Sequence, residues 1–302
     1  MRIGVALGGG GARGWAHIGV LRTLIGAGFE PDIIAGTSIG AIVGGAFAAG
    51  RLDELETFAR AIDRRTIWRL TDVNLGKGGG LVIGERVVQS LTEIIGQREI
   101  ALLAKKFAAI ATEIPTGHEV WIETGNLIPA IRASYALPGI FIPVEIDGRM
   151  LIDGGITNPV PVSACRAMGA QIVIAVPLPA IQGVAKRLAK QAPPPDASAW
   201  TKALAAFREP ERFVARQLFG DEPDALTTAS VSVAALNILL DRMTRVRLAS
   251  DPPDITITPD IAEIALLEFD RAQDAIAIGA AAAEKALPEI EAMVKGRKSP
   301  PA

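Results

Sequence analysis

An apolar strand runs directly into a Gly-x-Ser-x-Gly turn and then into an alanine-rich helical pattern between Ile33 and Ala41. This connection restricts the fold, because the turn crowds the backbone and needs glycine at Gly36 and Gly40. Such a turn lifts a serine hydroxyl above the sheet, and the following helix points its free N–H groups and positive dipole end at the same place. Ser38 is therefore either a nucleophile or a serine that only caps the helix.

A similar unit precedes this stretch. An apolar run over residues 3–7 stops at a glycine-rich loop, and a helical pattern follows that loop. The first 50 residues are thus expected to form a βαβα unit with a parallel strand pair. This is the start of a three-layer α/β/α sandwich with a mainly parallel central sheet. Both loops would lie at the C-terminal edge of that sheet, where open α/β proteins bind ligands.

The glycine loop over residues 9–14 fits the Gly-x-Gly-x-x-Gly pattern of dinucleotide-binding folds. Those folds need an acidic residue at the end of the second strand for the ribose, whereas Asp32 stands at the beginning of that strand. Glycine backbone can also turn several N–H groups inward as an oxyanion hole. The candidates for this role are Gly9, Gly10 and Gly11. Arg13, in the same loop, would hold a phosphate or anchor the loop to a carboxylate.

A hairpin pattern over residues 144–152 leads to a third candidate, Asp153, which is followed by Gly154 and Gly155. The two glycines leave the backbone free to bring the carboxylate close to another loop. The alternative is an aspartate that serves only as a turn residue or a helix cap.

The histidines argue against a usual Ser–His–Asp triad, in which the histidine follows the acid in the chain. His17 falls in the first helix and His118 in a hairpin turn, and both precede Asp153. If Ser38 is activated, we expect Asp153 to take its proton directly. Partial burial that raises the pKa of Asp153 would make this carboxylate a better base.

The remaining elements follow from periodicity and turn signals. Helices are expected over residues 51–64, 85–95, 127–136, 230–248 and 270–287, and strands over 107–112, 119–123, 171–176 and 255–258. Residues 66–84 are expected to be irregular, either a cover over the site or an ordinary excursion. Residues 178–225 form a variable segment, interpreted as a lid or membrane-facing insertion or as a solvated face. We expect one domain over residues 1–290 and a tail over 291–302.

Composition excludes several classes of protein. A formal net charge of -2 gives no sign of a nucleic-acid partner. The single cysteine, Cys165, rules out an internal disulfide, fits a reducing compartment and is expected to be buried in a helix. The apolar run at the N-terminus is too short for a signal-peptide core, and no stretch of about 18 residues is apolar enough to span a bilayer. We expect a cytoplasmic protein, soluble or peripheral at a membrane.

Three blocks, at residues 9–14, 36–40 and 153–155, resemble the signature blocks of the patatin-like phospholipase family in order and spacing. They are most similar to its bacterial branch, which is related to the catalytic domain of neuropathy target esterase. The similarity extends over about residues 1–290 and includes further stretches at 131–134, 138–139, 158–161 and 269–272. The chain departs from the pattern at Glu113, where relatives often carry aspartate, and in the variable segment.

This resemblance implies a Ser–Asp dyad acyl hydrolase in a patatin-like α/β/α fold. Ser38 would be the nucleophile and Asp153 the proton acceptor, with Arg13 beside an oxyanion loop formed by Gly9, Gly10 and Gly11. The implied substrates are fatty-acyl esters of phospholipids, lysophospholipids or neutral lipids, cleaved through an acyl-enzyme without cofactor or metal. Two alternatives are a thioesterase or transacylase with the same dyad, and a non-catalytic lipid-binding or regulatory protein on this fold.

Overall fold

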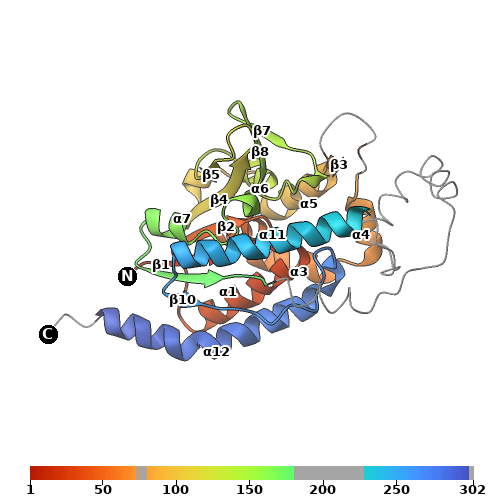
Figure 1. The fold of residues 1–302 in the computed structure, drawn as a ribbon. Coiled ribbons are helices and arrows are strands. Elements are labelled where there is room, and N and C mark those ends of the chain that lie inside the picture. Colours follow the sequence, from red (N-terminus) through yellow and green to blue (C-terminus); the bar gives the residue numbers. More distant parts are fainter. Residues whose placement is uncertain (73, 75–79, 180–227, 299–302) are drawn as a thin grey trace.

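The computed structural model describes residues 1–72, 74, 80–179 and 228–298 (Figure 1). Its elements in chain order are β1 (Ile3–Leu7), the 3₁₀ helix η1 (Gly11–Trp15), α1 (Ala16–Gly26), β2 (Ile33–Thr37), α2 (Ile39–Ala48), α3 (Leu52–Ala61), α4 (Arg64–Leu70), β3 (Gly80–Val82), α5 (Glu85–Ile95), η2 (Ile100–Leu102), β4 (Lys106–Glu113), β5 (Glu119–Ile122), α6 (Leu127–Ser134), β6 (Gly139–Phe141), β7 (Val144–Ile146), β8 (Arg149–Asp153), η3 (Gly154–Ile156), α7 (Val162–Ala167), β9 (Ile172–Val176), α11 (Thr228–Ser250), β10 (Ile255–Thr256), η4 (Phe269–Arg271) and α12 (Ala272–Lys298).

Within the described residues, eight strands form the main sheet in the order β10-β9-β1-β2-β4-β8-β7, and β5 pairs with β4. The strands from β10 to β4 are parallel, whereas β5, β7 and β8 add antiparallel pairings. A small second sheet pairs β3 with β6. The predicted α/β fold with a mainly parallel central sheet is confirmed, because five consecutive strands of this sheet, from β10 at one edge to β4, run parallel.

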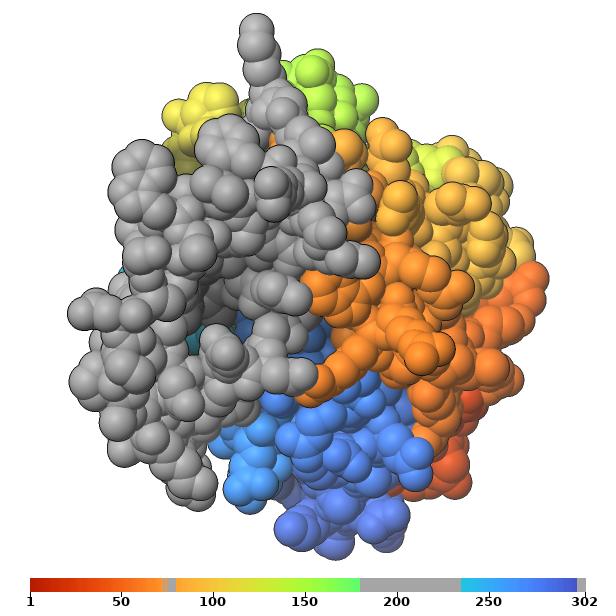
Figure 2. Space-filling view, turned by 90° about the vertical axis from the view of Figure 1, so that its right-hand side faces the viewer, coloured from red at the N-terminus to blue at the C-terminus, as the bar shows by residue number. Residues whose placement is uncertain are grey.

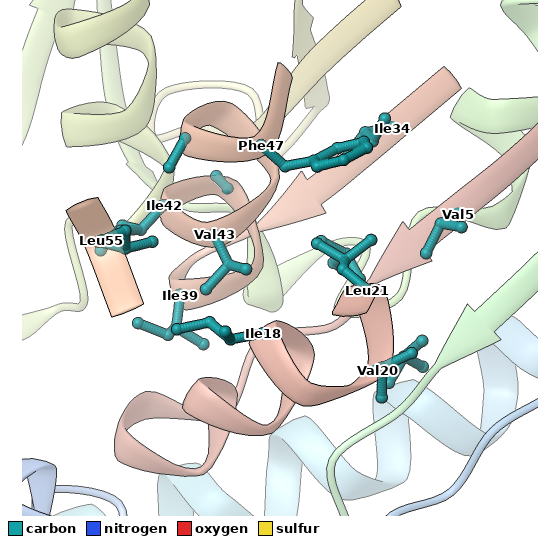
Figure 3. Close-up of a cluster of buried hydrophobic side chains, with 14 of the residues drawn as sticks. Val5, Ile18, Val20, Leu21, Ile34, Ile39, Ile42, Val43, Phe47 and Leu55 are labelled. Carbon is teal, nitrogen blue, oxygen red and sulfur yellow. The ribbon is translucent and has the colours of Figure 1, made fainter. Parts of the chain in front are cut away.

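Side chains of the parallel strands alternate between two buried faces, as the pleat requires. In β1, Val5 and Leu7 belong to the larger core and Ala6 to the smaller one. Helices α1, α2 and α6 cover the larger core, with α12 packed on α1, and α7 covers the smaller one. Figure 3 shows the larger core, in which Ile18 of α1 and Ile39 of α2 lie close together. The sheet therefore lies between two helical layers.

The longest strand, β4, brings two predicted site segments together. The register places Thr37 of β2 opposite Ile110 and Asp153 of β8 opposite Ala111. The ends of β2 and β8 therefore meet at neighbouring positions of one strand. Since β1 lies on the other side of β2, Ser38 stands between the glycine loop after β1 and Asp153 at the end of β8.

Several predicted boundaries are wrong. The single helix expected over 51–64 is two helices, because Asp63 accepts a hydrogen bond from the N–H of Thr66 and caps a new helix, α4. Residues 66–84, expected to be irregular, contain most of α4 and the strand β3. Helices α11 and α12 are longer than predicted, and α12 continues through Pro288 into the predicted tail.

The predicted variable segment, residues 178–225, lies outside the described residues except for its first two positions. Its interpretation as a lid, a membrane-facing insertion or a solvated face therefore stays a prediction. In the part of the chain that the structure describes, no helix combines the length and the apolar character needed to cross a bilayer.

Candidate active site

Ser38 occupies the turn between β2 and α2 with φ 57° and ψ -121°. Among the described non-glycine residues, only Asp147 shares a positive φ. A serine in this region is strained, and such strain persists where the surrounding structure imposes it. The flanking glycines allow the turn to close, since a Cβ on Gly36 would lie 2.3 Å from the carbonyl oxygen of Gly40, and a Cβ on Gly40 2.2 Å from that of Leu7. The predicted need for both glycines is confirmed.

The backbone of Ser38 is fixed by Ser134, a residue for which the sequence predicts no functional role. The N–H of Ser38 donates to the hydroxyl of Ser134 at 2.9 Å, and that hydroxyl donates to the carbonyl of Ile110 at 2.6 Å. Ser134 thus ties the turn to β4. The side chain of Ser38 makes no capping hydrogen bond to α2, so the alternative of a serine that serves only as a helix cap does not describe this turn.

Asp153 is buried, and its two carboxylate oxygens differ. Oδ1 accepts a hydrogen bond from the N–H of Gly155 at 2.7 Å, which is the capping role considered from the sequence. Oδ2 is buried and forms no hydrogen bond within the described residues. Burial raises the pKa of Asp153 to about 6, and the hydroxyl of Ser38 and the N–H of Gly155 act against this rise. The carboxylate therefore keeps one oxygen available, with Ser38 as its neighbour.

The three candidate glycines of the first loop are not equivalent. The N–H of Gly9 donates to the carbonyl of Pro159 at 2.9 Å, so this donor is already engaged. The N–H groups of Gly10 and Gly11 form no hydrogen bond with any described residue. Gly9 instead lets the loop backbone lie close to Ser38, because a Cβ at this position would be 3.5 Å from the Cβ of Ser38. The loop therefore contains two backbone N–H groups without a partner among the described residues.

Two buried side chains hold the carbonyl groups of this loop. Arg13 donates from Nε to the carbonyl of Gly10 at 3.0 Å and from Nη2 to Oδ1 of Asn237 in α11 at 2.9 Å. These contacts favour the anchoring role for Arg13, with a carbonyl and an amide oxygen among its partners. His17 donates from Nε2 to the carbonyl of Gly8 at 2.8 Å. Because burial lowers the pKa of His17 to about 4, the imidazole is neutral at pH 7 and has a structural role.

The other titratable candidates lie outside this cluster. His118 is exposed in the turn between β4 and β5. Cys165 is buried in α7 as predicted, and burial raises the pKa of its thiol to about 12. Within the described residues, no group of three or more histidine, cysteine, aspartate or glutamate side chains is arranged to hold a metal ion.

Ser38, Asp153 and the glycine loop open into a cavity of about 410 Å³. Its walls come from segments throughout the chain and are mostly aliphatic or aromatic; examples are Trp15, Phe58, Ile67, Val87, Leu91, Ile140 and Phe269. Ile67 and Val82 belong to residues 66–84, the stretch interpreted from the sequence as a cover over the site or an ordinary excursion. This stretch therefore contributes to the cavity wall. Figure 2 views the molecule from the side on which α4 lies in Figure 1, with α3 and α4 in orange beside the blue C-terminal segments.

Three residues of the site have no sequence signal that predicts a functional role. Ser134 belongs to a block that was quoted for the family resemblance, but nothing in that block indicates a bond to the serine turn. Tyr135 follows it and lines the cavity. Asn237 lies on one side of an amphipathic helix, and its bond to Arg13 joins positions 224 residues apart. Sequence periodicity contains no signal for such a contact.

Comparisons with known proteins agree with this geometry. The model of the patatin-like phospholipase family matches residues 5–166. An uncharacterized NTE family protein of Mycobacterium tuberculosis is 44% identical over 177 residues, which are 59% of this chain and 49% of the relative. Lysophospholipase NTE1 of Mycosarcoma maydis is 34% identical over 191 residues, 62% of this chain and 10% of that protein. The chain thus spans about half the length, or less, of these curated relatives.

A solved structure supports the fold. VipD from Legionella pneumophila superposes with a TM-score of 0.50 at 12% sequence identity, over 95% of this chain and 67% of that chain. At this identity the likeness concerns the arrangement of helices and strands alone.

Proposed function

Because this chain belongs to the patatin-like phospholipase family, we propose that it is a serine acyl hydrolase that cleaves fatty-acyl esters of phospholipids, lysophospholipids or related lipids. The observation that carries the proposal is the strained Ser38 beside the buried, half-satisfied carboxylate of Asp153 at the floor of an apolar cavity. The name of the relative from Mycosarcoma maydis, a lysophospholipase, points to the same class of substrate.

In the proposed reaction, the hydroxyl oxygen of Ser38 attacks the ester carbonyl, and its proton passes to Oδ2 of Asp153. Negative charge develops on the carbonyl oxygen, which would face the N–H groups of Gly10 and Gly11. When the tetrahedral intermediate collapses, Asp153 gives its proton to the departing alcohol oxygen, and an acyl-enzyme remains on Ser38. Water then attacks the acyl group while Asp153 accepts a proton from it, and Asp153 returns this proton to the oxygen of Ser38 as the fatty acid is released.

The burial of Asp153 suits this role. A carboxylate with an ordinary pKa is a weak base, whereas one with a pKa of about 6 holds a proton more firmly and is still mostly ionised at pH 7. Oδ2 of Asp153 has no hydrogen-bond partner among the described residues. The nearby hydroxyl of Ser38 would donate its proton to this oxygen.

The same dyad would also cleave a thioester or transfer the acyl group to another acceptor, so a thioesterase or transacylase is the second candidate. The lysophospholipase name of a relative favours oxygen esters. A non-catalytic lipid-binding protein would need the apolar cavity but not a serine held at positive φ.

Hydrolysis of p-nitrophenyl butyrate and of a lysophosphatidylcholine by wild type, Ser38→Ala and Asp153→Asn tests the proposal, with folding followed by circular dichroism. We expect both variants to lose at least a hundredfold in kcat/KM. Ser250→Ala and Asp147→Asn are matched controls, since both positions are exposed and neither lines the cavity. Activity that survives in folded Ser38→Ala would reject Ser38 as nucleophile, and a wild type inactive on both esters would reject the hydrolase.

A further inference from the structure

Ser134, the last residue of α6, carries a buried hydroxyl whose hydrogen-bond partners lie outside its own helix. A serine in a helix commonly bonds the carbonyl of the preceding turn. The hydroxyl of Ser134 instead donates to the carbonyl of Ile110 in β4 at 2.6 Å and accepts from the N–H of Ser38 at 2.9 Å. The helix itself does not use this hydroxyl, and alanine would suit the same helical position at least as well.

The turn at Ser38 depends on this contact. Ser38 has φ 57°, a strained conformation that persists where neighbouring contacts impose it. The flanking Gly36 and Gly40 permit the turn but do not select it, since glycine adopts other conformations as readily. Without the hydroxyl of Ser134, the N–H of Ser38 would have no partner among the described residues, and the peptide group before Ser38 could rotate. The hydroxyl of Ser134 therefore helps to fix the direction in which the Ser38 side chain points.

The same part of the chain also holds Asp153. The carbonyl of Ala136, two residues after Ser134, accepts a hydrogen bond from the N–H of Asp153 at 3.0 Å. The carbonyl of Ile110 lies against the residue after Asp153, because a Cβ on Gly154 would be 2.2 Å from its oxygen. Residues 134–136 and the end of β4 therefore contact the backbone of both members of the proposed dyad.

We propose that Ser134 is a positioning residue, whose hydroxyl holds the turn of Ser38 in the orientation that brings the Ser38 hydroxyl to Asp153. This inference rests on the proposed function and extends it to a residue that acts through Ser38. Ser134 is fully buried and does not line the cavity, so it has no contact with the substrate. A reacting group displaced by about 1 Å can lose roughly a hundredfold in rate while the substrate still binds.

The test compares wild type, Ser134→Ala and a control, Thr92→Val, on p-nitrophenyl butyrate, with melting followed by circular dichroism. We expect Ser134→Ala to lose roughly a hundredfold in kcat while KM stays within about threefold. Thr92 of α5 also donates its hydroxyl to a backbone carbonyl, that of Val88 at 2.8 Å, but it does not line the cavity. Thr92→Val should therefore keep the kcat of wild type, even if its melting temperature falls.

The acid limb of the pH profile is a second readout, which a purely structural role of Ser134 would not move. The hydroxyl of Ser38 holds the pKa of Asp153 below the value that burial alone would give. If this hydroxyl moves away from Asp153 in Ser134→Ala, the pKa of Asp153 rises. The acid limb of kcat/KM in the variant should then lie at higher pH than in wild type.

Two results would overturn this role of Ser134 while the hydrolase stands. A folded Ser134→Ala with the kcat of wild type would show that Ser38 keeps its place without the hydroxyl. A loss of kcat with an unmoved acid limb would show that the hydroxyl of Ser38 still lies at Asp153.

If Ser134→Ala does not fold, Ser134→Cys takes its place, because it keeps the approximate size of the side chain and weakens both hydrogen bonds. A loss of roughly tenfold in kcat is then expected, and an unchanged kcat would overturn the inference. Wild type that cleaves neither p-nitrophenyl butyrate nor lysophosphatidylcholine would reject the proposed function, and the role of Ser134 with it.

Discussion

At Asp153, the burial that suits a proton acceptor also destabilises the folded protein. A carboxylate whose pKa rises from 3.8 to about 6 on folding binds protons more tightly in the folded state. Stability is therefore greatest when Asp153 is protonated and falls as pH rises through this range. Catalysis needs the opposite protonation state, because only the ionised carboxylate can accept the proton of Ser38.

The raised pKa of Asp153 predicts how turnover depends on pH. We expect kcat/KM on a p-nitrophenyl ester to rise about tenfold per pH unit at acid pH and to level off above a pKa near 6. Initial rates between pH 4.5 and 8, at constant ionic strength and with circular dichroism at each pH, measure the profile. A limb centred near pH 4 would contradict the buried position of the base.

The second prediction concerns stability. Asp153→Asn removes the titration, so the variant should gain stability over wild type as pH rises from 4 to 7, by up to about 3 kcal/mol. Urea unfolding of both proteins at pH 4, 5.5 and 7 measures the difference. A difference that does not change with pH would mean that Asp153 titrates alike in the folded and unfolded chain.

At the scale of elements, a helix late in the chain supports a loop near its beginning. Asn237 of α11 holds Arg13, and Arg13 holds the carbonyl of Gly10, so the orientation of the glycine loop depends on α11. Hydrogen-bond donors act in catalysis only when they are preorganised toward the developing charge. Asn237 also lines the cavity, and through its hydrogen bond with Arg13 it acts as a positioning residue for the loop.

We predict that Asn237→Ala lowers kcat by about ten- to hundredfold, with a smaller change in KM, because the loop loses a support while the apolar side chains of the cavity wall stay in place. Asn237→Asp keeps an oxygen for Arg13 and should recover much of the loss. Leu239→Ala, an exposed position of the same helix, is the control. Steady-state kinetics on one ester distinguish these variants, and equal kcat values in all of them would remove Asn237 from this role.

At the scale of the whole molecule, the cavity combines residues from the first loop to the C-terminal η4 helix, with α3, α4, α5 and α11 between them. Its walls are largely apolar, and burial of each methylene group contributes about 0.8 kcal/mol. An acyl chain would therefore gain affinity with its length until the cavity is full.

The corresponding prediction is a rise in kcat/KM along p-nitrophenyl esters from acetate to octanoate, by up to about fourfold per methylene. The series has the same leaving group throughout, so acyl burial is the only variable that changes. A flat series would show that the acyl chain stays outside this cavity.

Much of the fold and of the site could be predicted from the sequence, because both depend on local patterns. The strand and helix periods around Ser38 give the parallel unit, and Gly36 and Gly40 are needed by a turn within five residues of chain. The predicted boundaries of α3 and α4 are wrong because one side chain, the N-cap Asp63, determines where α4 begins. The roles of Ser38 and Asp153 remain predictions that kinetics must test.

The sequence by itself determined the alternation of strands and helices, the serine turn and the glycine loops, since each arises from contacts between near neighbours in the chain. The tertiary structure decided which of these groups meet. It paired β2 and β8 with successive residues of β4, engaged the N–H of Gly9, joined Arg13 to Asn237 and joined the N–H of Ser38 to Ser134. Such long-range contacts depend on the packing of the whole core, and no local pattern encodes them.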